Sequence, residues 1–169
     1  MEPNSHNSSI EKLAHKLKCR WPAIEKSLRS TEAKRKNLSS LLNQDIKVNA
    51  EEWNEDWSIV AFGSIARNEW TAGSDLDWTL LVDGMASSGH FGMTQDIARR
   101  IEKAKYKGPG PAGVFGNMAF SHDIIHRIGG ENDTNRNTTQ RILLLLESTV
   151  IGGRADAHDR VIRGILALS

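Results

Sequence analysis

One stretch decides the fold: Val60-Ala-Phe-Gly-Ser-Ile-Ala-Arg-Asn-Glu-Trp-Thr-Ala-Gly-Ser-Asp-Leu-Asp-Trp-Thr-Leu-Leu-Val82. In this stretch an apolar run ends in Phe62, Gly63 and Ser64, and a second apolar run follows Asp77. Short, nearly continuous apolar runs beside glycine and polar residues are typical of buried strands. The stretch therefore predicts a strand, a tight Gly-Ser turn, a short helix, a loop and a second strand that opens on two aspartates.

The turn at Gly63 and Ser64 has the composition of an anion-binding turn. A strand that leads into a helix presents free backbone N–H groups at the helix N-terminus, where the helix dipole also favours negative charge. Glycine lets the backbone approach a ligand closely, and the serine hydroxyl adds a further donor. Gly-Ser turns are also common in ordinary loops, so the turn alone is weak evidence for phosphate binding.

Asp75 and Asp77 form a pair of carboxylates at the head of the second strand. A spacing of two places both side chains on the same face of a strand. Two adjacent carboxylates repel each other unless a cation joins them, and hard oxygen ligands suit Mg²⁺. An isolated Asp-x-Asp is commonly a loop feature, so the combination with the Gly-Ser turn is what indicates a metal-bound triphosphate.

The order apolar strand, Gly63-Ser64, spacer, Ser74-Asp75-Leu76-Asp77 and apolar strand resembles the signature of the DNA-polymerase-β-like nucleotidyltransferase superfamily. Its Gly-Ser-Ile-Ala-Arg-Asn-Glu and Gly-Ser-Asp-Leu-Asp segments look most like the bacterial stand-alone and uridylyltransferase-type branches. The flanking elements agree with that fold over residues 57–125. The resemblance implies an α/β (α+β) nucleotidyltransferase fold with a small mixed sheet flanked by helices.

The resemblance also implies an activity. Asp75 and Asp77 would bind two Mg²⁺ ions, and Gly63 and Ser64 would hold the β- and γ-phosphates of a nucleoside triphosphate such as ATP. The metals would stabilise charge during an in-line displacement at the α-phosphorus. Pyrophosphate would leave, and a nucleoside monophosphate would pass to an acceptor. The acceptor is open between a protein, a small molecule and RNA.

Two further residues near the motif are candidates for nucleotide binding, Arg67 and Ser74. Arg67 supports the phosphates or the aspartate loop, or else forms a structural salt bridge to another element. An ion pair between Arg67 and Glu69 is not expected, because residues two apart on a helix do not face each other.

Members of this superfamily usually have a third acid on a neighbouring strand, which completes the metal site and accepts the acceptor's proton. Asp123 is the nearest candidate here. If the third strand continues to Ile125, Asp123 lies on one face of it and is catalytic. If Ser121 instead caps a helix, Asp123 is only a favourable acid in its first turn.

A polar segment, residues 133–139, precedes the helix for which the sequence signal is strongest. Helix capping is one interpretation of these polar side chains. The alternative is that Arg136 or Arg141 contacts the triphosphate.

The composition limits the class of protein. A chain of 169 residues is long enough for one domain with a sizeable core, and 25% charged and 38% apolar residues are ordinary for a globular protein. No apolar run approaches the roughly 20 residues that span a bilayer. One cysteine excludes an internal disulfide and a thiol-rich zinc site. We expect a cytoplasmic protein without a membrane partner.

The net charge of +1 gives no general case for nucleic-acid binding, but basic side chains are concentrated in the N-terminal part. They are Lys12, Lys16, Lys18, Arg20, Lys26, Arg29, Lys34, Arg35 and Lys36. They form either a solvated helix face or a surface for an anionic partner.

We expect three parts: an N-terminal helical segment (1–50), a nucleotidyltransferase core (51–130), and C-terminal helices (131–169) packed on the core or extending it. Periodicity predicts helices over residues 10–28 with a break at Pro22, 31–43, 64–70, 94–106, 138–150 and 156–168. Strands are predicted over 57–62, 77–82 and 114–120, and residues 85–92 are predicted to form a loop.

Two other functions compete with transfer: an inactive nucleotide-binding or regulatory module, and an antitoxin-like minimal nucleotidyltransferase that acts on a protein partner. The last predicted helix ends while still apolar, at Ile165-Leu-Ala-Leu-Ser169. Such an end belongs to a minimal enzyme, to a homo-oligomer or partner interface, or to a shortened chain.

Overall fold

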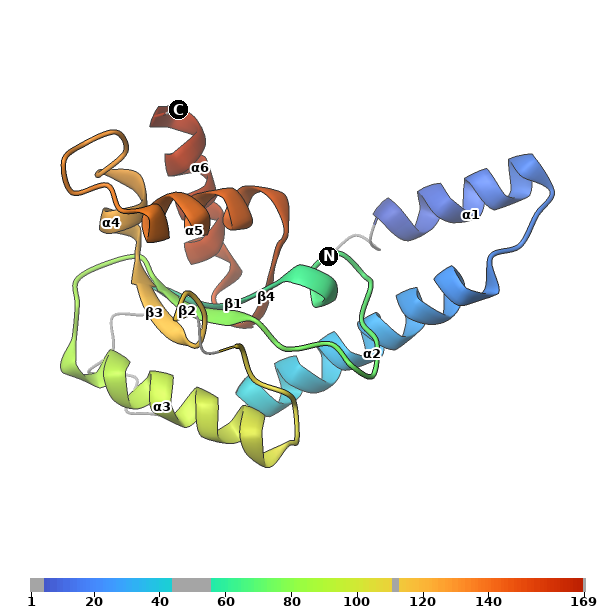
Figure 1. Cartoon of the computed structure of the whole chain (residues 1–169), viewed down its shortest axis with the longest axis horizontal. Helices are drawn as coiled ribbons and strands as arrows, with labels where there is room; N and C mark the ends of the chain where they lie inside the picture. Colours follow the sequence, from blue (N-terminus) through green and yellow to red (C-terminus); the bar gives the residue numbers. More distant parts are fainter. Residues whose placement is uncertain (1–4, 44–55, 111–112, 169) are drawn as a thin grey trace.

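The centre of the computed structural model, which describes residues 5–43, 56–110 and 113–168, is a four-stranded sheet in the order β3-β2-β1-β4 (Figure 1). Strand β1 pairs antiparallel with both β2 and β4, whereas β2 and β3 are parallel. The strands are β1 (Trp57–Phe62), β2 (Trp78–Val82), β3 (Asn117–Phe120) and β4 (Ser148–Gly153). A small mixed sheet flanked by helices is the predicted fold class, and it is confirmed.

Helices cover both faces of this sheet. Alternate residues of a strand point to opposite faces, so Ile59 packs with one layer and Val60 with the other. One layer contains α2 (Pro22–Asn43) and α3 (Ser88–Lys103). The other contains α4 (Ser121–Ile125), α5 (Asn135–Leu146) and α6 (Ala155–Leu168). Burial on both sides explains why the strands read as continuous apolar runs.

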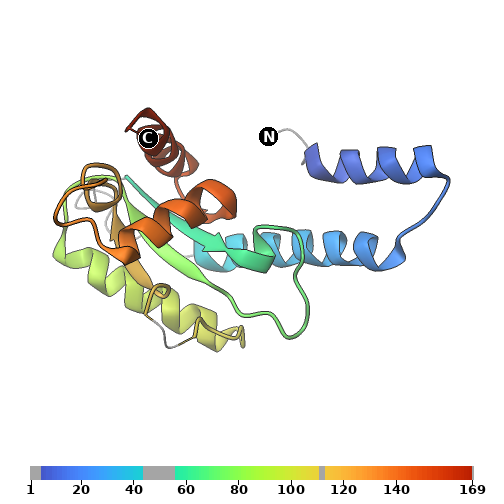
Figure 2. The ribbon, with the colours of Figure 1, turned by 45° about the horizontal axis from the view of Figure 1, so that its top comes forward.

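The N-terminal helices form a hairpin that projects from one end of the sheet (Figures 1 and 2). Helix α1 (Ser5–Leu17) ends before Lys18, which has a left-handed φ of 50°. The break predicted at Pro22 is confirmed, because α1 ends at Leu17 and Pro22 begins α2. The helices predicted over 10–28 and 31–43 are not separate after this break, since α2 continues without interruption to Asn43. Proline suits this first helical position because its missing N–H has no partner there in any case.

The fourth strand was not predicted. The helix expected over 138–150 ends at Leu146, and β4 begins at Ser148. A Cβ atom on Gly153 would lie 2.5 Å from the Trp57 ring, and Gly153 has a φ of +73°. The end of β4 therefore requires glycine at this position, where the strand crosses the start of β1.

Smaller differences concern the limits of elements. The predicted helix over 64–70 is only one 3₁₀ turn, η1 (Gly63–Ile65). Helix α3 begins inside the predicted 85–92 loop, since Ser87 caps it by accepting a hydrogen bond from the Gly89 N–H. Among the described helices, none combines the length and apolar character of a membrane span.

Candidate active site

One end of the sheet collects the residues that the sequence analysis singled out. Because β1 is antiparallel to both of its neighbours, its last residues lie beside the first residues of β2 and β4. Ala61 pairs with Trp78, and Phe62 pairs with Ser148. The turn after β1, the aspartates before β2 and the residue before β4 therefore meet at the same end of the sheet.

The turn after β1 is the 3₁₀ turn η1, and its first residue, Gly63, has a φ of +68°. The Gly63 carbonyl accepts from the Arg67 N–H at 2.9 Å, and the Ser64 carbonyl accepts from the Glu69 N–H at 2.7 Å. The N–H groups at the start of a helical turn have no acceptor inside it. A Cβ atom on Gly63 would lie 3.8 Å from Oδ2 of Asp77, so the glycine borders the carboxylate.

Asp75 and Asp77 lie in the loop that leads into β2, which itself begins at Trp78. The Phe62 N–H donates to the Asp77 carbonyl at 3.0 Å and fixes Asp77 to the end of β1. Partial burial raises the pKa of the Asp77 carboxyl, and the negative charges of Asp75 and then Glu147 raise it further. Burial and like charge both disfavour the ionised form, and a bound cation would relieve both.

Lys107 supplies the counter-charge to this loop. Its Nζ lies 2.5 Å from Oδ1 of Asp75, and its carbonyl accepts from the Leu76 N–H at 2.7 Å. The Leu76 side chain between the aspartates is fully buried. The loop is thus anchored by its apolar residue while both carboxylates stay partly exposed.

Glu147 is the acid that the sequence analysis missed. It is the C-cap of α5, immediately before β4, and its carboxylate accepts from Nη1 of Arg67. The available signal was an acid directly before a strand, as Asp77 is before β2. That signal was hidden because the following residues were assigned to a helix.

Arg67 contacts two acids. Its Nε lies 2.8 Å from Oε2 of Glu69, so the prediction that this pair would not form is wrong. Hydrogen bonds to Glu69 and then to Glu147 raise the pKa of Arg67. Because Arg67 is in a tight turn and not in a regular helix, the spacing rule for helices does not apply.

Asp123 is at the other end of the sheet. Since β2 and β3 are parallel, Phe120 pairs with Val82 and the chain leaves β3 at the end opposite to Asp77. Ser121 begins α4, and Asp123 is an acid in its first turn that pairs with Arg127 at 2.8 Å. Of the two alternatives for Asp123, the continuation of the strand to Ile125 is therefore wrong, and the acid in the first turn of a helix is found. The structure does not bring Asp123 to the other aspartates.

Two further candidates, Ser74 and Arg141, have local structural partners. The Ser74 hydroxyl accepts from the Thr71 N–H at 3.0 Å within the turn before the aspartates. Arg141 is buried, and its Nη2 lies 2.6 Å from Oδ2 of Asp133. Thr134 caps α5 by accepting from the Asn137 N–H, which confirms the capping interpretation of the polar segment.

A cavity of about 610 Å³ adjoins Arg67 and Glu147. Its wall is mixed and comes from α1, α2, α5, α6, residues 66–68 and the start of β4. The apolar side chains are Ile10, Leu28, Ala66, Leu144, Leu145, Leu146 and Ile162, and the polar ones include Asn68, Ser148, Thr149 and His158. Both arginines on it have protein partners: Arg67 binds Glu147, and Arg35 donates to the Ile65 carbonyl. The cavity therefore offers both apolar side chains and uncharged polar groups beside a carboxylate.

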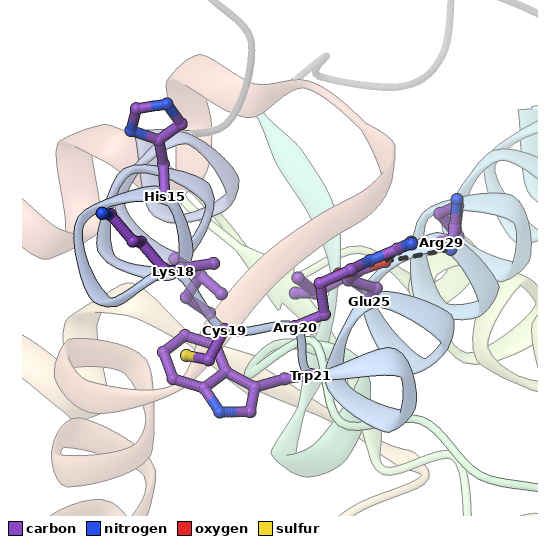
Figure 3. A pocket seen from close by; sticks show the side chains of 10 residues that line it. His15, Lys18, Cys19, Arg20, Trp21, Glu25 and Arg29 are labelled. Carbon is purple, nitrogen blue, oxygen red and sulfur yellow. Dashed lines mark ion pairs between the residues drawn. The ribbon is translucent and has the colours of Figure 1, made fainter.

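A second cavity, of about 630 Å³, lies between α1 and α2 (Figure 3). Cys19 and Trp21 line it, together with Glu25, which pairs with Arg20 and Arg29 at 3.6 Å each. Its walls include neither the Gly63 turn nor the aspartate loop. We place the candidate site where Asp75 and Asp77 meet the Gly63 turn. The cavity that adjoins Arg67 is next to this site and includes one of its acids, Glu147, in its wall.

The donor set fits a divalent cation in part. Asp75 and Asp77 supply hard oxygen ligands of like charge, and Gly63 leaves space beside Oδ2 of Asp77. Within the described ranges, no group of three or more His, Cys, Asp or Glu side chains is placed to hold a metal ion. The structure thus provides a carboxylate pair, with Glu147 held to one side by Arg67.

Comparison with known proteins identifies a family for part of the chain. The family model for the nucleotidyltransferase domain matches residues 42–111, which include the Gly63 turn, both aspartates and α3. The match is consistent with the polymerase-β-like superfamily inferred from the motif. No curated protein matches the chain.

Proposed function

We propose that this chain, whose residues 42–111 match the family model for the nucleotidyltransferase domain, is a transferase that moves a nucleoside monophosphate from a nucleoside triphosphate to an acceptor, with metal ions and with release of pyrophosphate. The observation that carries the proposal is the meeting of the Gly63 turn with Asp75 and Asp77 at one end of the sheet. A triphosphate needs both an anion-binding turn and carboxylates that hold its metal.

Asp75 and Asp77 would hold Mg²⁺, with two ions as in the superfamily that the motif resembles. Such ions neutralise charge on the triphosphate and on the leaving pyrophosphate. Gly63 and Ser64 bind the terminal phosphates through backbone N–H groups and the serine hydroxyl. Lys107, whose ammonium already pairs with Asp75, adds positive charge at the same place.

We assign the role of third carboxylate to Glu147 in place of Asp123. Glu147 is close enough to influence the Asp77 carboxyl, and it borders the cavity in which an acceptor can lie. In this role it accepts the proton of the acceptor hydroxyl. Arg67 donates to the Glu147 carboxylate and orients it.

The acceptor enters through the cavity beside Glu147. The two arginines on its wall are engaged by protein oxygens, so an acceptor's phosphates would gain little there. Leu145 and Leu146 are 41% and 78% exposed and offer apolar contact instead. An acceptor that places an uncharged, partly apolar group next to its hydroxyl fits this wall best.

A nucleotide-binding module without transfer is the second candidate. It is favoured by one observation: Glu147 is bound to Arg67, and no third acid joins Asp75 and Asp77 among the described residues. For transfer, the Glu147 carboxylate must therefore move from Arg67 toward Asp75 and Asp77. Nucleotide binding alone needs no such movement.

The proposal is tested by incubating the chain with Mg²⁺ and each of the four α-³²P-labelled nucleoside triphosphates. Protein, RNA and small-molecule fractions of a cell extract serve as acceptors. The wild type should move label, and Asp75→Ala/Asp77→Ala should not. Asp159→Ala, which removes an acid that is 60% exposed on α6, is the matched control. Nucleotide binding without transfer would support the second candidate.

A further inference from the structure

Three side chains of α2, one helical turn apart, bind the backbone that follows the Gly63 turn. Arg35 donates to the Ile65 carbonyl from Nε at 2.8 Å and from Nη2 at 2.6 Å, and Nη2 also donates to the Ala66 carbonyl at 2.9 Å. Thr31 Oγ1 accepts from the Trp70 N–H at 3.0 Å, and Ser27 Oγ donates to the Asn68 carbonyl at 3.2 Å. Helix α2 thus binds residues 65–70 at successive positions.

These contacts involve groups that are costly to bury alone. Burial lowers the pKa of Arg35, and the Thr31 side chain is fully buried. The last carbonyls of a helical turn have no donor inside the turn, and a guanidinium is a strong charged donor. The polar side chains of α2 and the backbone groups of residues 65–70 therefore supply each other's hydrogen bonds. Separating them would leave partly buried polar groups without partners.

The same contacts set the direction of the turn. The Gly63 and Ser64 carbonyls are bound by N–H groups three to five residues later, and the Ile65 and Ala66 carbonyls are bound by Arg35. With these four oxygens engaged, the N–H groups of the turn are the ones left to face an anion. Asn68 has a left-handed φ of 65°, and Ser27 binds its carbonyl, so this strained residue is also fixed from α2.

We propose that Arg35, assisted by Thr31 and Ser27, positions the phosphate-binding turn for the triphosphate, so that α2 is a working part of the nucleotide site. These three residues precede the span that matches the nucleotidyltransferase domain, residues 42–111. Arg35 acts through the Ile65 and Ala66 carbonyls and is a positioning residue. A turn whose N–H groups are already aligned binds its ligand without first losing conformational freedom. The inference rests on the proposed function.

The test compares Arg35→Met and Arg35→Lys with Lys36→Met. Lys36 is a matched control because it is on the same helix, is 75% exposed and pairs only with Glu32 among the contacts of the described chain. Two quantities are measured: amide hydrogen exchange of residues 63–70 without nucleotide, and the Kd for a Mg²⁺–α,β-methylene nucleoside triphosphate by calorimetry.

Arg35→Met should speed exchange of these amides and raise the Kd about tenfold, as expected for the loss of hydrogen bonds from a charged donor. Arg35→Lys should recover part of both effects, since an ammonium can still donate to the Ile65 carbonyl. Lys36→Met should change neither. Normal exchange, or an unchanged Kd, in a folded Arg35→Met protein would overturn the proposal.

If Arg35→Met does not fold, Thr31→Val tests the same contact without removing a charge. It removes the acceptor of the Trp70 N–H and the hydrogen bond from the Thr31 hydroxyl to the Ser27 carbonyl within α2. The exchange measurement uses no nucleotide, so it tests the positioning of the turn by α2 separately from the proposed nucleotidyl transfer. A wild type that binds none of the triphosphates would contradict the proposed function, whereas unchanged exchange in both variants would contradict positioning by α2.

Discussion

Glu147 lies close enough to Asp77 for its negative charge to raise the pKa of the Asp77 carboxyl. The two residues are far apart in the sequence, and they meet because each precedes a strand that is antiparallel to β1. Burial and the neighbouring acids disfavour the ionised form of Asp77 at this end of the sheet, and a bound cation would relieve both.

Asp77→Asn should raise Tm at pH 7. A carboxyl with a raised pKa in the folded state binds its proton more tightly there than in the unfolded chain, whose value is 3.8. The free energy of unfolding therefore falls as pH rises from the unfolded pKa through the folded one. The amide removes this penalty, so the difference in Tm should shrink below about pH 4, where both states are protonated.

Mg²⁺ gives the control for this experiment. Mg²⁺ should raise the Tm of the wild type, because an ion that binds the folded state stabilises that state. It should raise the Tm of Asp77→Asn less, because this variant lacks one of the carboxylates that bind the ion. A lower Tm for Asp77→Asn at pH 7 would show that the carboxylate is stabilising as it stands.

Glu147→Gln should lower the rate of transfer about 100-fold, as the loss of a general base does. Asp123→Asn should leave the rate within about twofold, since Asp123 is at the opposite end of the sheet in an ion pair with Arg127. The rates are measured as pyrophosphate release with the acceptor found for the wild type. If Asp123→Asn lowered the rate more than Glu147→Gln, Asp123 and not Glu147 would be the third carboxylate.

Gly63→Ala should weaken both stability and nucleotide binding. A φ of +68° costs an alanine about 1–2 kcal/mol, and the added methyl group would lie 3.8 Å from Oδ2 of Asp77, in the space next to the metal ligands. Chemical denaturation measures the first effect and calorimetry the second. Gly92→Ala is the control, since that glycine is in α3 and its added methyl group would meet nothing within 4 Å. Equal binding by both variants would argue against a ligand beside Gly63.

Leu145→Glu should raise the KM for the acceptor and leave the affinity for the nucleotide unchanged. Leu145 is on the wall of the cavity beside Glu147, and a negative charge there disturbs an apolar contact surface. Ile142→Glu, a change at an apolar residue of the same helix that is 49% exposed and outside that wall, is the matched control. A larger effect from Ile142→Glu would mean that the acceptor approaches by another route.

The local parts of the site could be predicted from the sequence, because Gly63, Asp75 and Asp77 belong to one short motif between two apolar strands. Their spacing fixes their chemistry before any tertiary contact forms. Glu147 could not be found in this way, because it follows an apolar helix and its position depends on the pairing of β4 with β1. The role of Arg35 was hidden for the same reason: it depends on where α2 lies against residues 65–70.

The most direct test of the central claim is a calorimetric titration of the chain with the α,β-methylene analogues of the four nucleoside triphosphates, with and without Mg²⁺. Wild type and Asp75→Asn/Asp77→Asn are compared, with Asp159→Asn as control. We predict that the wild type binds at least one analogue in the presence of Mg²⁺, and that the double variant binds it about 100-fold more weakly or not at all. Equal, Mg²⁺-independent affinity in the wild type and the double variant would contradict a metal–triphosphate site at this end of the sheet.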